Sequence, residues 1–224
     1  FKVHSEIKIQ MSSDSLFSTA QAIGSGTISI SSALVDFSPD IMVVYADRFE
    51  GLAAVIASSQ MGIPTAHIEG GDLTEGGALD DSVRHAMTKL SHIHFTTNQQ
   101  ASNRILGMGE ETWRVHTVGF PAIDLISEGE YATQEEVLNI LGLDERNPII
   151  LFTQHSVSTQ YDQAAKQVHP ALQAMKSLAE EGMQVIMTYP NNDAGGRAII
   201  SEKKSIAEKG IARIQLHRSL GRYL

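Results

Sequence analysis

Short apolar segments alternate with amphipathic stretches along most of this 224-residue chain, and this alternation limits its possible folds more than any other feature. Residues 41–45 read Ile-Met-Val-Val-Tyr, a continuous apolar run of the kind found in strands buried on both faces. Residues 49–60 follow it and are rich in Ala and Leu, which indicates a helix. Strands that alternate with helices imply βαβ units and a mostly parallel sheet. We therefore expect an α/β fold.

The same alternation predicts the remaining elements. Strands are expected over residues 41–45, 64–68, 92–96, 114–118, 149–154, 184–189 and 212–216, and helices over 49–60, 80–90, 98–106, 121–126, 164–180 and 198–209. Asp80 is a candidate N-cap of its helix, with Arg84 one turn later on the same side. Residues 1–38 give a weaker signal, because the apolar stretch 25–35 is also rich in Ser and Gly.

Residues 127–147 interrupt the pattern. They carry many charges and a capping-box pair, Thr133 with Glu136, which opens a helix that ends near Gly142. The chain is therefore predicted to contain two Rossmann-like parallel-sheet units. The predicted boundaries are an N-terminal domain over 1–127, a linker or hinge over 128–147 and the first part of a C-terminal domain over 148–224.

Composition excludes several classes of function. The chain has no cysteine, which rules out disulfides and thiol catalysis. Its formal net charge of −9 argues against a nucleic-acid partner, whose phosphates require a basic face. No apolar run approaches the roughly 20 residues that cross a bilayer, and no basic segment followed by an apolar stretch opens the chain. We expect a cytoplasmic protein without a membrane partner.

Polar side chains follow the predicted strands at their carboxyl ends, where open parallel sheets bind ligands. Asp47 and Glu69 follow the first two strands, and Asp80 lies at the start of the next helix. Clustered carboxylates raise one another's pKa, which suits general acid and base catalysis. The alternative is that Asp47 and Asp80 cap helices and that Glu69 is solvated in a loop. Three such residues at consecutive strand ends favour a catalytic site.

Basic side chains at the same ends are candidates to bind a diphosphate. Arg offers planar forked donors for phosphate, and His can donate a hydrogen bond or act as an acid. The candidates are Arg48, Arg84, Arg197, His155 and His217. Surface arginines and structurally satisfied histidines are the alternative, and it applies more to His217 than to His155.

One long segment resembles a known family. Residues 67–94 read HIEGGDLTEGGALDDSVRHAMTKLSHIH, which is similar to the hydrolysing UDP-N-acetylglucosamine 2-epimerases that open sialic-acid synthesis. Further matches follow in order: Asp47-Arg-Phe-Glu, Val118-Gly-Phe-Pro-Ala-Ile-Asp, Thr153-Gln-His and Pro190-Asn-Asn-Asp-Ala-Gly. The resemblance covers about residues 40–220.

The resemblance implies a GT-B type fold with the active site in the cleft between two domains. Family members split UDP-GlcNAc into UDP and N-acetylmannosamine by elimination through 2-acetamidoglucal and addition of water, without a cofactor or an essential metal. The family's catalytic carboxylates fall on Asp47, Glu69 and Asp80. Its substrate-binding residues fall on Arg48, Arg84, His155, Asn191, Arg197 and His217. A homodimer or homotetramer is expected.

The chain also departs from the family pattern. The family usually has Gly before the Asp-Arg pair, where this chain has Ala46, and a methyl group could crowd a tight strand end. The family's Gly-Thr-Arg and Gly-Asn-Ser-Ser-Ser-Gly loops are absent, so the fold is expected to be incomplete at both termini. We expect the 224-residue chain alone to bind UDP-sugars poorly and to turn over slowly or not at all.

Three other functions remain open. A UDP-N,N′-diacetylbacillosamine 2-epimerase of legionaminic-acid synthesis would share these motifs. A GT-B glycosyltransferase would transfer the sugar to an acceptor, although three acidic residues at strand ends fit proton abstraction at carbon better. A catalytically idle sugar-nucleotide-binding remnant would bind the ligand without releasing product.

Overall fold

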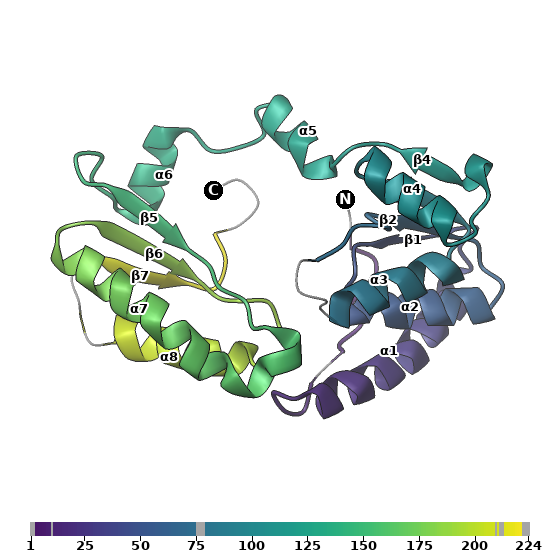
Figure 1. The fold of residues 1–224 in the computed structure, drawn as a ribbon, viewed down its shortest axis with the longest axis horizontal. Helices are drawn as coiled ribbons and strands as arrows, with labels where there is room; N and C mark the ends of the chain where they lie inside the picture. Colours follow the sequence, from purple (N-terminus) through teal and green to yellow (C-terminus); the bar gives the residue numbers. More distant parts are fainter. Residues whose placement is uncertain (1–2, 10, 75–78, 209, 211–212, 221–224) are drawn as a thin grey trace. The chain divides into compact units, whose positions relative to one another are not determined.

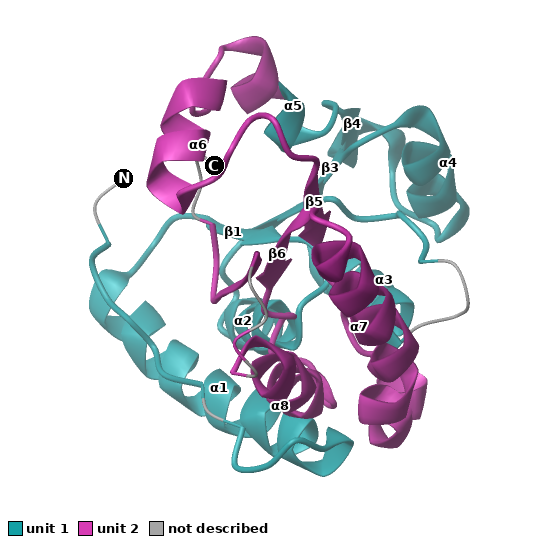
Figure 2. Cartoon of the chain, turned by 90° about the vertical axis from the view of Figure 1, so that its left-hand side faces the viewer, with its two compact units in different colours: residues 1–123 teal, residues 124–224 magenta. Residues whose placement is uncertain are grey.

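A computed structural model describes residues 3–220 of the chain, except residues 10, 75–78, 209 and 211–212. The chain divides into two compact units, residues 1–123 and 124–224 (Figure 2). Each unit contains one sheet, and every strand pair in both sheets is parallel. The predicted fold class, two parallel-sheet α/β units, is confirmed. The exact domain boundaries stay a prediction.

The first unit is built on a four-stranded sheet with the strand order β1-β2-β3-β4 (Figure 1). Its elements are α1 (Leu16–Phe37), β1 (Met42–Tyr45), α2 (Phe49–Gln60), β2 (Thr65–Ile68), α3 (Leu79–Leu90), β3 (Ile93–Thr96), α4 (Gln99–Gly107), the short 3-10 helix η1 (Thr112–Arg114) and β4 (Val115–Thr117), followed by α5 (Pro121–Ser127) across the boundary. The predicted strands and helices of this part are all present to within about one residue at each end.

Helix α1 was not predicted from the sequence. Ala22, Gly26, Ile30 and Leu34 recur every four residues, so the Ser- and Gly-rich segment has one apolar stripe that is buried. Together with Ala53 and Ala57 of α2, Ile30 and Leu34 form an apolar cluster between the two helices. Ser15 caps the helix by accepting a hydrogen bond from the backbone N–H of Ser18.

The second unit contains a three-stranded sheet with the order β5-β6-β7. Its elements are α6 (Gln134–Leu141), β5 (Ile149–Phe152), the 3-10 helix η2 (Ser158–Gln163), α7 (Ala164–Glu180), β6 (Gln184–Thr188), α8 (Gly196–Ala207) and β7 (Ile214–His217). Helices α7 and α8 lie on the same face of this sheet (Figure 1). The buried side chains of Val168, Leu172, Val185, Met187 and Ile199 form the core between them.

The capping box of α6 is present as predicted. The side chain of Thr133 accepts a hydrogen bond from the backbone N–H of Glu136, and the Glu136 carboxylate accepts one from the Thr133 N–H. Gly142 ends the helix in the left-handed conformation. The predicted end of α8 at residue 209 and the predicted start of β7 at residue 212 lie outside the described residues. Among the helices of the described ranges, none combines the length and apolar character that a bilayer-spanning helix requires.

Candidate active site

The chain turns sharply at the carboxyl ends of β1 and β2. The Ala46 N–H donates to the Ile68 carbonyl at 2.9 Å, which makes the last contact between the two strands. Ala46 and Glu69 then adopt left-handed backbone conformations, with φ of 61° and 64°. An L-residue with a side chain rarely adopts this conformation. These two turns place Asp47 and Glu69 at the same edge of the sheet.

Arg84 of α3 connects Asp47 to the loop that follows β2. Its guanidinium forms an ion pair with the Asp47 carboxylate and a second one with Asp81 at 3.1 Å. It also donates to the Asp72 carbonyl at 2.8 Å. Arg84 is only 8% exposed, so these contacts fix the position of its side chain. The Asp47 carboxylate therefore has a preset orientation at the sheet edge.

Tyr45 orients the second predicted carboxylate. Its phenol donates a hydrogen bond to Glu69 Oε1. Burial raises the pKa of Tyr45 to about 12, together with the hydrogen bond to Glu69 and the negative charges of Glu69 and Asp47. The phenol therefore stays protonated at neutral pH and remains a donor.

His67 lies beneath both turns with no solvent exposure. Its Nε2 bonds to the Ala46 carbonyl at 2.7 Å, and its Nδ1 lies 3.2 Å from the Thr88 hydroxyl. Because a carbonyl only accepts, Nε2 carries the proton and Nδ1 accepts from Thr88. Burial lowers the pKa of His67 to about 4, so the ring is neutral at pH 7. The His67 imidazole thereby fixes the position of the backbone of Ala46, the residue before Asp47.

Asp80 lies in the first turn of α3, four residues before Arg84. The helix begins at Leu79, so the expectation that Asp80 is its N-cap is wrong. Asp81 forms an ion pair with Arg84 at 3.1 Å, and it also accepts a hydrogen bond from the Thr74 N–H at 2.7 Å. Residues 75–78, which belong to the segment that resembles the family, lie outside the described residues.

The loop after β2 has little room for side chains. Gly71 has a φ of 84°, and a Cβ at this position would lie 2.5 Å from the Ala101 carbonyl oxygen. The next residue, Asp72, accepts hydrogen bonds from the Thr97 hydroxyl at 2.7 Å and from the Asn98 amide at 3.2 Å. The loop is therefore tied to the start of α4, and this supports the backbone that Arg84 binds.

In the second unit the structure brings His155 and Asn191 together. They follow β5 and β6, and the Asn191 N–H donates to His155 Nδ1 at 3.0 Å. The Asn191 side chain also donates to Asp193 at 2.6 Å. His155 Nδ1 is thus an acceptor, which leaves Nε2 as the ring nitrogen able to donate to a ligand when the ring is neutral.

The other predicted binding residues are placed separately. Arg48 lies at the same edge as Asp47, because it follows Asp47 directly and precedes α2. Its side chain pairs with Glu50 at 3.4 Å. Arg197 is exposed in the first turn of α8. His217 is the last residue of β7, opposite Thr188, and its Nε2 lies 2.9 Å from the Gln215 side chain.

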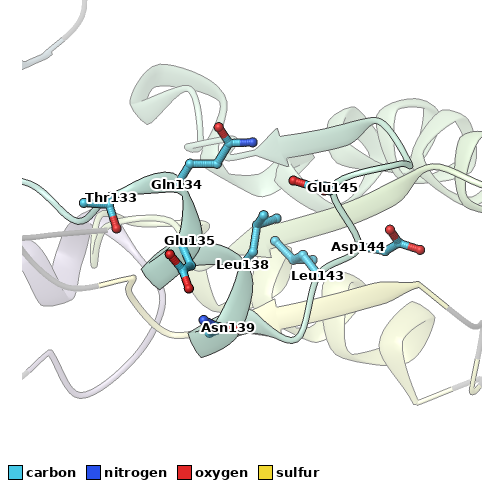
Figure 3. A pocket seen from close by; sticks show the side chains of 8 residues that line it. All are labelled: Thr133, Gln134, Glu135, Leu138, Asn139, Leu143, Asp144 and Glu145. Atoms are coloured by element: carbon cyan, nitrogen blue, oxygen red, sulfur yellow. The ribbon is translucent and has the colours of Figure 1, made fainter.

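A surface pocket of the second unit lies away from the carboxyl ends of its strands. Its lining comes from α6 and the loop that follows, and none of the predicted site residues belongs to it (Figure 3). Glu135, Asp144 and Glu145 give this lining a negative charge. Arg146 holds the pKa of Asp144 at about 2, so its carboxylate is ionised at neutral pH. Such a pocket repels an anionic diphosphate.

Sequence reasoning missed the supporting roles of Tyr45 and His67, and the burial of Lys203. Lys203 had a visible signal, because it follows Ile199 by four residues and precedes Ile206 by three, inside the apolar stripe of α8. Tyr45 ends an apolar run and gave no sign of a polar partner. The predicted absence of a metal and of a cofactor stays a prediction.

The fold and this site define an α/β protein with carboxylates at the edge of one parallel sheet and a second group of polar residues, which includes His155 and Asn191, at the edge of another. The model of the UDP-N-acetylglucosamine 2-epimerase family matches residues 1–224, and the chain belongs to that family. This family assignment agrees with the resemblance that the sequence motifs show.

Individual relatives support the assignment. The chain is 37% identical over 183 residues to a UDP-N-acetylglucosamine 2-epimerase of Neisseria meningitidis, covering 81% of this chain and 47% of the relative. It is 32% identical over 199 residues to a hydrolysing UDP-N,N′-diacetylbacillosamine 2-epimerase of Legionella pneumophila, covering 89% and 52%. The chain thus spans about half the length of these relatives.

Among solved structures, the fold is similar to that of UDP-GlcNAc 2-epimerase from Neisseria meningitidis bound to UDP-GlcNAc. The TM-score is 0.67 at 18% identity, with 90% of this chain and 55% of that chain covered. At this identity the likeness concerns the fold, and it agrees with the GT-B type that the motifs imply.

Proposed function

We propose that this chain carries the catalytic carboxylates and part of the sugar-nucleotide site of a hydrolysing UDP-GlcNAc 2-epimerase. The reaction is the conversion of UDP-GlcNAc to N-acetylmannosamine and UDP, for sialic-acid synthesis. The observation that carries the proposal is the arrangement of Asp47 and Glu69 after neighbouring parallel strands, with Arg84 bound to Asp47 and Tyr45 bound to Glu69.

The proposed chemistry divides into two steps. In the first, a base removes the C2 proton while the bond from C1 to the UDP oxygen breaks, which leaves 2-acetamidoglucal and UDP. In the second, water adds to C1 and a proton adds to C2 on the opposite face. A base, an acid and a group that orients water are needed, and Asp47, Glu69 and Asp80 are the proposed providers. Arg84 and Tyr45 orient two of them.

The second unit is proposed to bind the UDP portion. His155 and Asn191 lie together after β5 and β6. Arg197 lies in the first turn of α8, and His217 is the last residue of β7. Arg48 is also proposed to bind the sugar nucleotide. Neutral donors and arginines of this kind suit phosphate and uracil oxygens.

Incubation of UDP-GlcNAc with excess chain in deuterated water tests the proposal. We expect UDP and N-acetylmannosamine that carries deuterium at C2, detected by mass spectrometry. Asp47→Asn, Glu69→Gln and Asp80→Asn should each reduce the single-turnover rate at least 100-fold, since one acid or base contributes roughly 10²–10⁴-fold. Product with protium at C2 would contradict the proposed elimination. No product from the unchanged chain would show that this part of the enzyme is not sufficient for turnover, as the missing family loops lead us to expect.

The bacillosamine sugar is the second candidate substrate. The hydrolysing Legionella relative acts on UDP-N,N′-diacetylbacillosamine, according to its name, and it is 32% identical to this chain. Parallel rate measurements with both sugars decide between them. Product only in the presence of a sugar acceptor would instead indicate a glycosyltransferase, and binding of UDP without product would indicate a remnant. A homodimer or homotetramer stays a proposal, and sedimentation velocity tests it.

A further inference from the structure

Lys203 is a buried lysine in the second unit. It belongs to the inward stripe of α8, and its relative exposure is 0%. Its Nζ donates to the Thr188 carbonyl at 2.7 Å and lies 5.0 Å from the centre of the Phe152 ring. Within the part of the chain that the structure describes, no carboxylate forms an ion pair with it. A buried ammonium with one carbonyl and one aromatic face is poorly compensated for its lost hydration.

The Lys203 ammonium lies next to the ends of β5 and β6, and these strands lead into the two segments that are predicted to bind the ligand, which contain His155 and Asn191. Phe152 ends β5 and Thr188 ends β6, so Nζ is at the carboxyl edge of the sheet. The Thr188 hydroxyl is hydrogen-bonded to the hydroxyl of Thr153, which begins the Thr-Gln-His segment. Three residues after Thr188 comes Asn191, whose N–H donates to His155. Lys203 is therefore connected to both ligand-binding segments through the backbone of Thr188.

No neighbouring charge accounts for the lowered pKa of Lys203. The titratable groups of the adjoining elements are His155 after β5, Tyr189 and Asp193 after β6, His217 on β7, Lys166, His169, Lys176 and Glu180 on α7, and Arg197, Glu202 and Lys204 on α8. Burial alone lowers the pKa of Lys203 to about 8. The ammonium is thus the main form at neutral pH, but it loses its proton at a lower pH than an ordinary lysine does.

We propose that Lys203 is the buried countercharge for the anionic diphosphate bound by the second unit, and that binding of this anion holds the proton on its Nζ at higher pH than in the free chain. The inference rests on the proposed function. An anion at the sheet edge stabilises a nearby cation in a medium of low dielectric, so the protonated amine is favoured in the complex. Lys203 acts through the electrostatic field of its charge and through its hydrogen bond to Thr188. It does not touch the ligand, so it is a positioning residue.

The dependence of UDP affinity on pH tests this role. The terminal phosphate of UDP has a pKa of about 6 and does not titrate further above about pH 7. For the unchanged chain, NMR titration should show affinity about threefold weaker near pH 8.5 than near pH 7, a range in which the uracil ring of UDP keeps its proton, and this corresponds to a change of roughly one pKa unit on binding. In Lys203→Met the affinity should be weaker near pH 7 and independent of pH over this range.

Lys176→Met is the matched control. It removes the same charge from the same unit, but Lys176 lies near the carboxyl end of α7 and pairs with Glu180 at 3.6 Å. We expect this variant to keep the pH dependence of the unchanged chain. A Lys203→Met variant with the same pH dependence as the unchanged chain would overturn the inference and leave the proposed function intact. No UDP binding by the unchanged chain would overturn both.

A direct titration keeps the inference testable without any variant. The ¹³Cε signal of Lys203 in labelled chain should titrate about one pH unit higher in saturating UDP than without ligand. An unchanged titration would overturn the inference. Lys203→Met should remain folded, because an apolar side chain in a buried cationic position is often neutral or stabilising.

Discussion

At the scale of single residues, the left-handed Ala46 before Asp47 is a point of backbone strain. Its φ is 61°, and a left-handed conformation costs an L-residue roughly 1–2 kcal/mol. Ala46→Gly removes this cost but adds entropy to the unfolded chain, so we expect a net stabilisation of about 0.5–1 kcal/mol. Urea denaturation measures it. Ala20→Gly on the exposed face of α1 is the control and should lose about 1 kcal/mol. Equal losses in both variants would contradict the assigned strain.

The buried His67 gives the first unit a dependence on pH. Its pKa in the folded chain is about 4, below its ordinary value, so the unfolded state binds more protons as the pH falls. Stability is therefore fully present above about pH 6.5 and is lost down to about pH 4, by on the order of 3 kcal/mol. His67→Gln keeps a donor for the Ala46 carbonyl and does not titrate.

We expect the loss between about pH 6.5 and pH 4 to be clearly smaller in His67→Gln than in the unchanged chain. His94, whose pKa burial also lowers, is present in both proteins and cancels in the comparison. Urea denaturation at several pH values measures the difference. Parallel pH curves for the two proteins would show that His67 is not the titrating group.

At the scale of secondary-structure elements, Gln184 connects the first residue of β6 to the loop before β5. Its side chain accepts from the Asp144 N–H at 2.8 Å and donates to the carbonyls of Asp144 at 2.8 Å and Asn147 at 3.3 Å. Gln184→Leu leaves these backbone groups without their partner and should cost about 2–4 kcal/mol. Gln173→Leu, on the exposed face of α7, should change stability by less than about 0.5 kcal/mol. Similar urea midpoints for the two variants would exclude this role.

At the scale of the whole molecule, the second unit has an exposed stretch shortly after its first residue, Asp124. Residues 128–131 between α5 and α6 are exposed and include Glu128 and Glu130. A Glu-specific protease should cut here first, apart from trimming of the ends, because exposed loops adopt the extended conformation that proteases need. Mass spectrometry of the early fragments identifies the site. A first cut at Glu202 within α8 would contradict the accessibility assigned to residues 128–131.

Local pattern alone determined most of the architecture. Residues 49–60 and 164–180 have the composition and periodicity of helices, and the structure has α2 and α7 over these same ranges. Polar residues after the apolar runs predicted that Asp47 and Glu69 would share an edge, because parallel strands place their carboxyl ends together. The helices and the strand ends depend on residues that are close together in the sequence, and so the sequence was sufficient to predict them.

Tertiary structure decided what depends on residues far apart in the chain. Helix α1 is stable because its stripe packs on α2, and a Ser- and Gly-rich segment carries no local sign of that partner. The burial of His67 and of Lys203 follows from the strands and helices that surround them, which removes water and lowers the pKa of each. Solvent exclusion is a property of the packed molecule, and a single sequence does not show it.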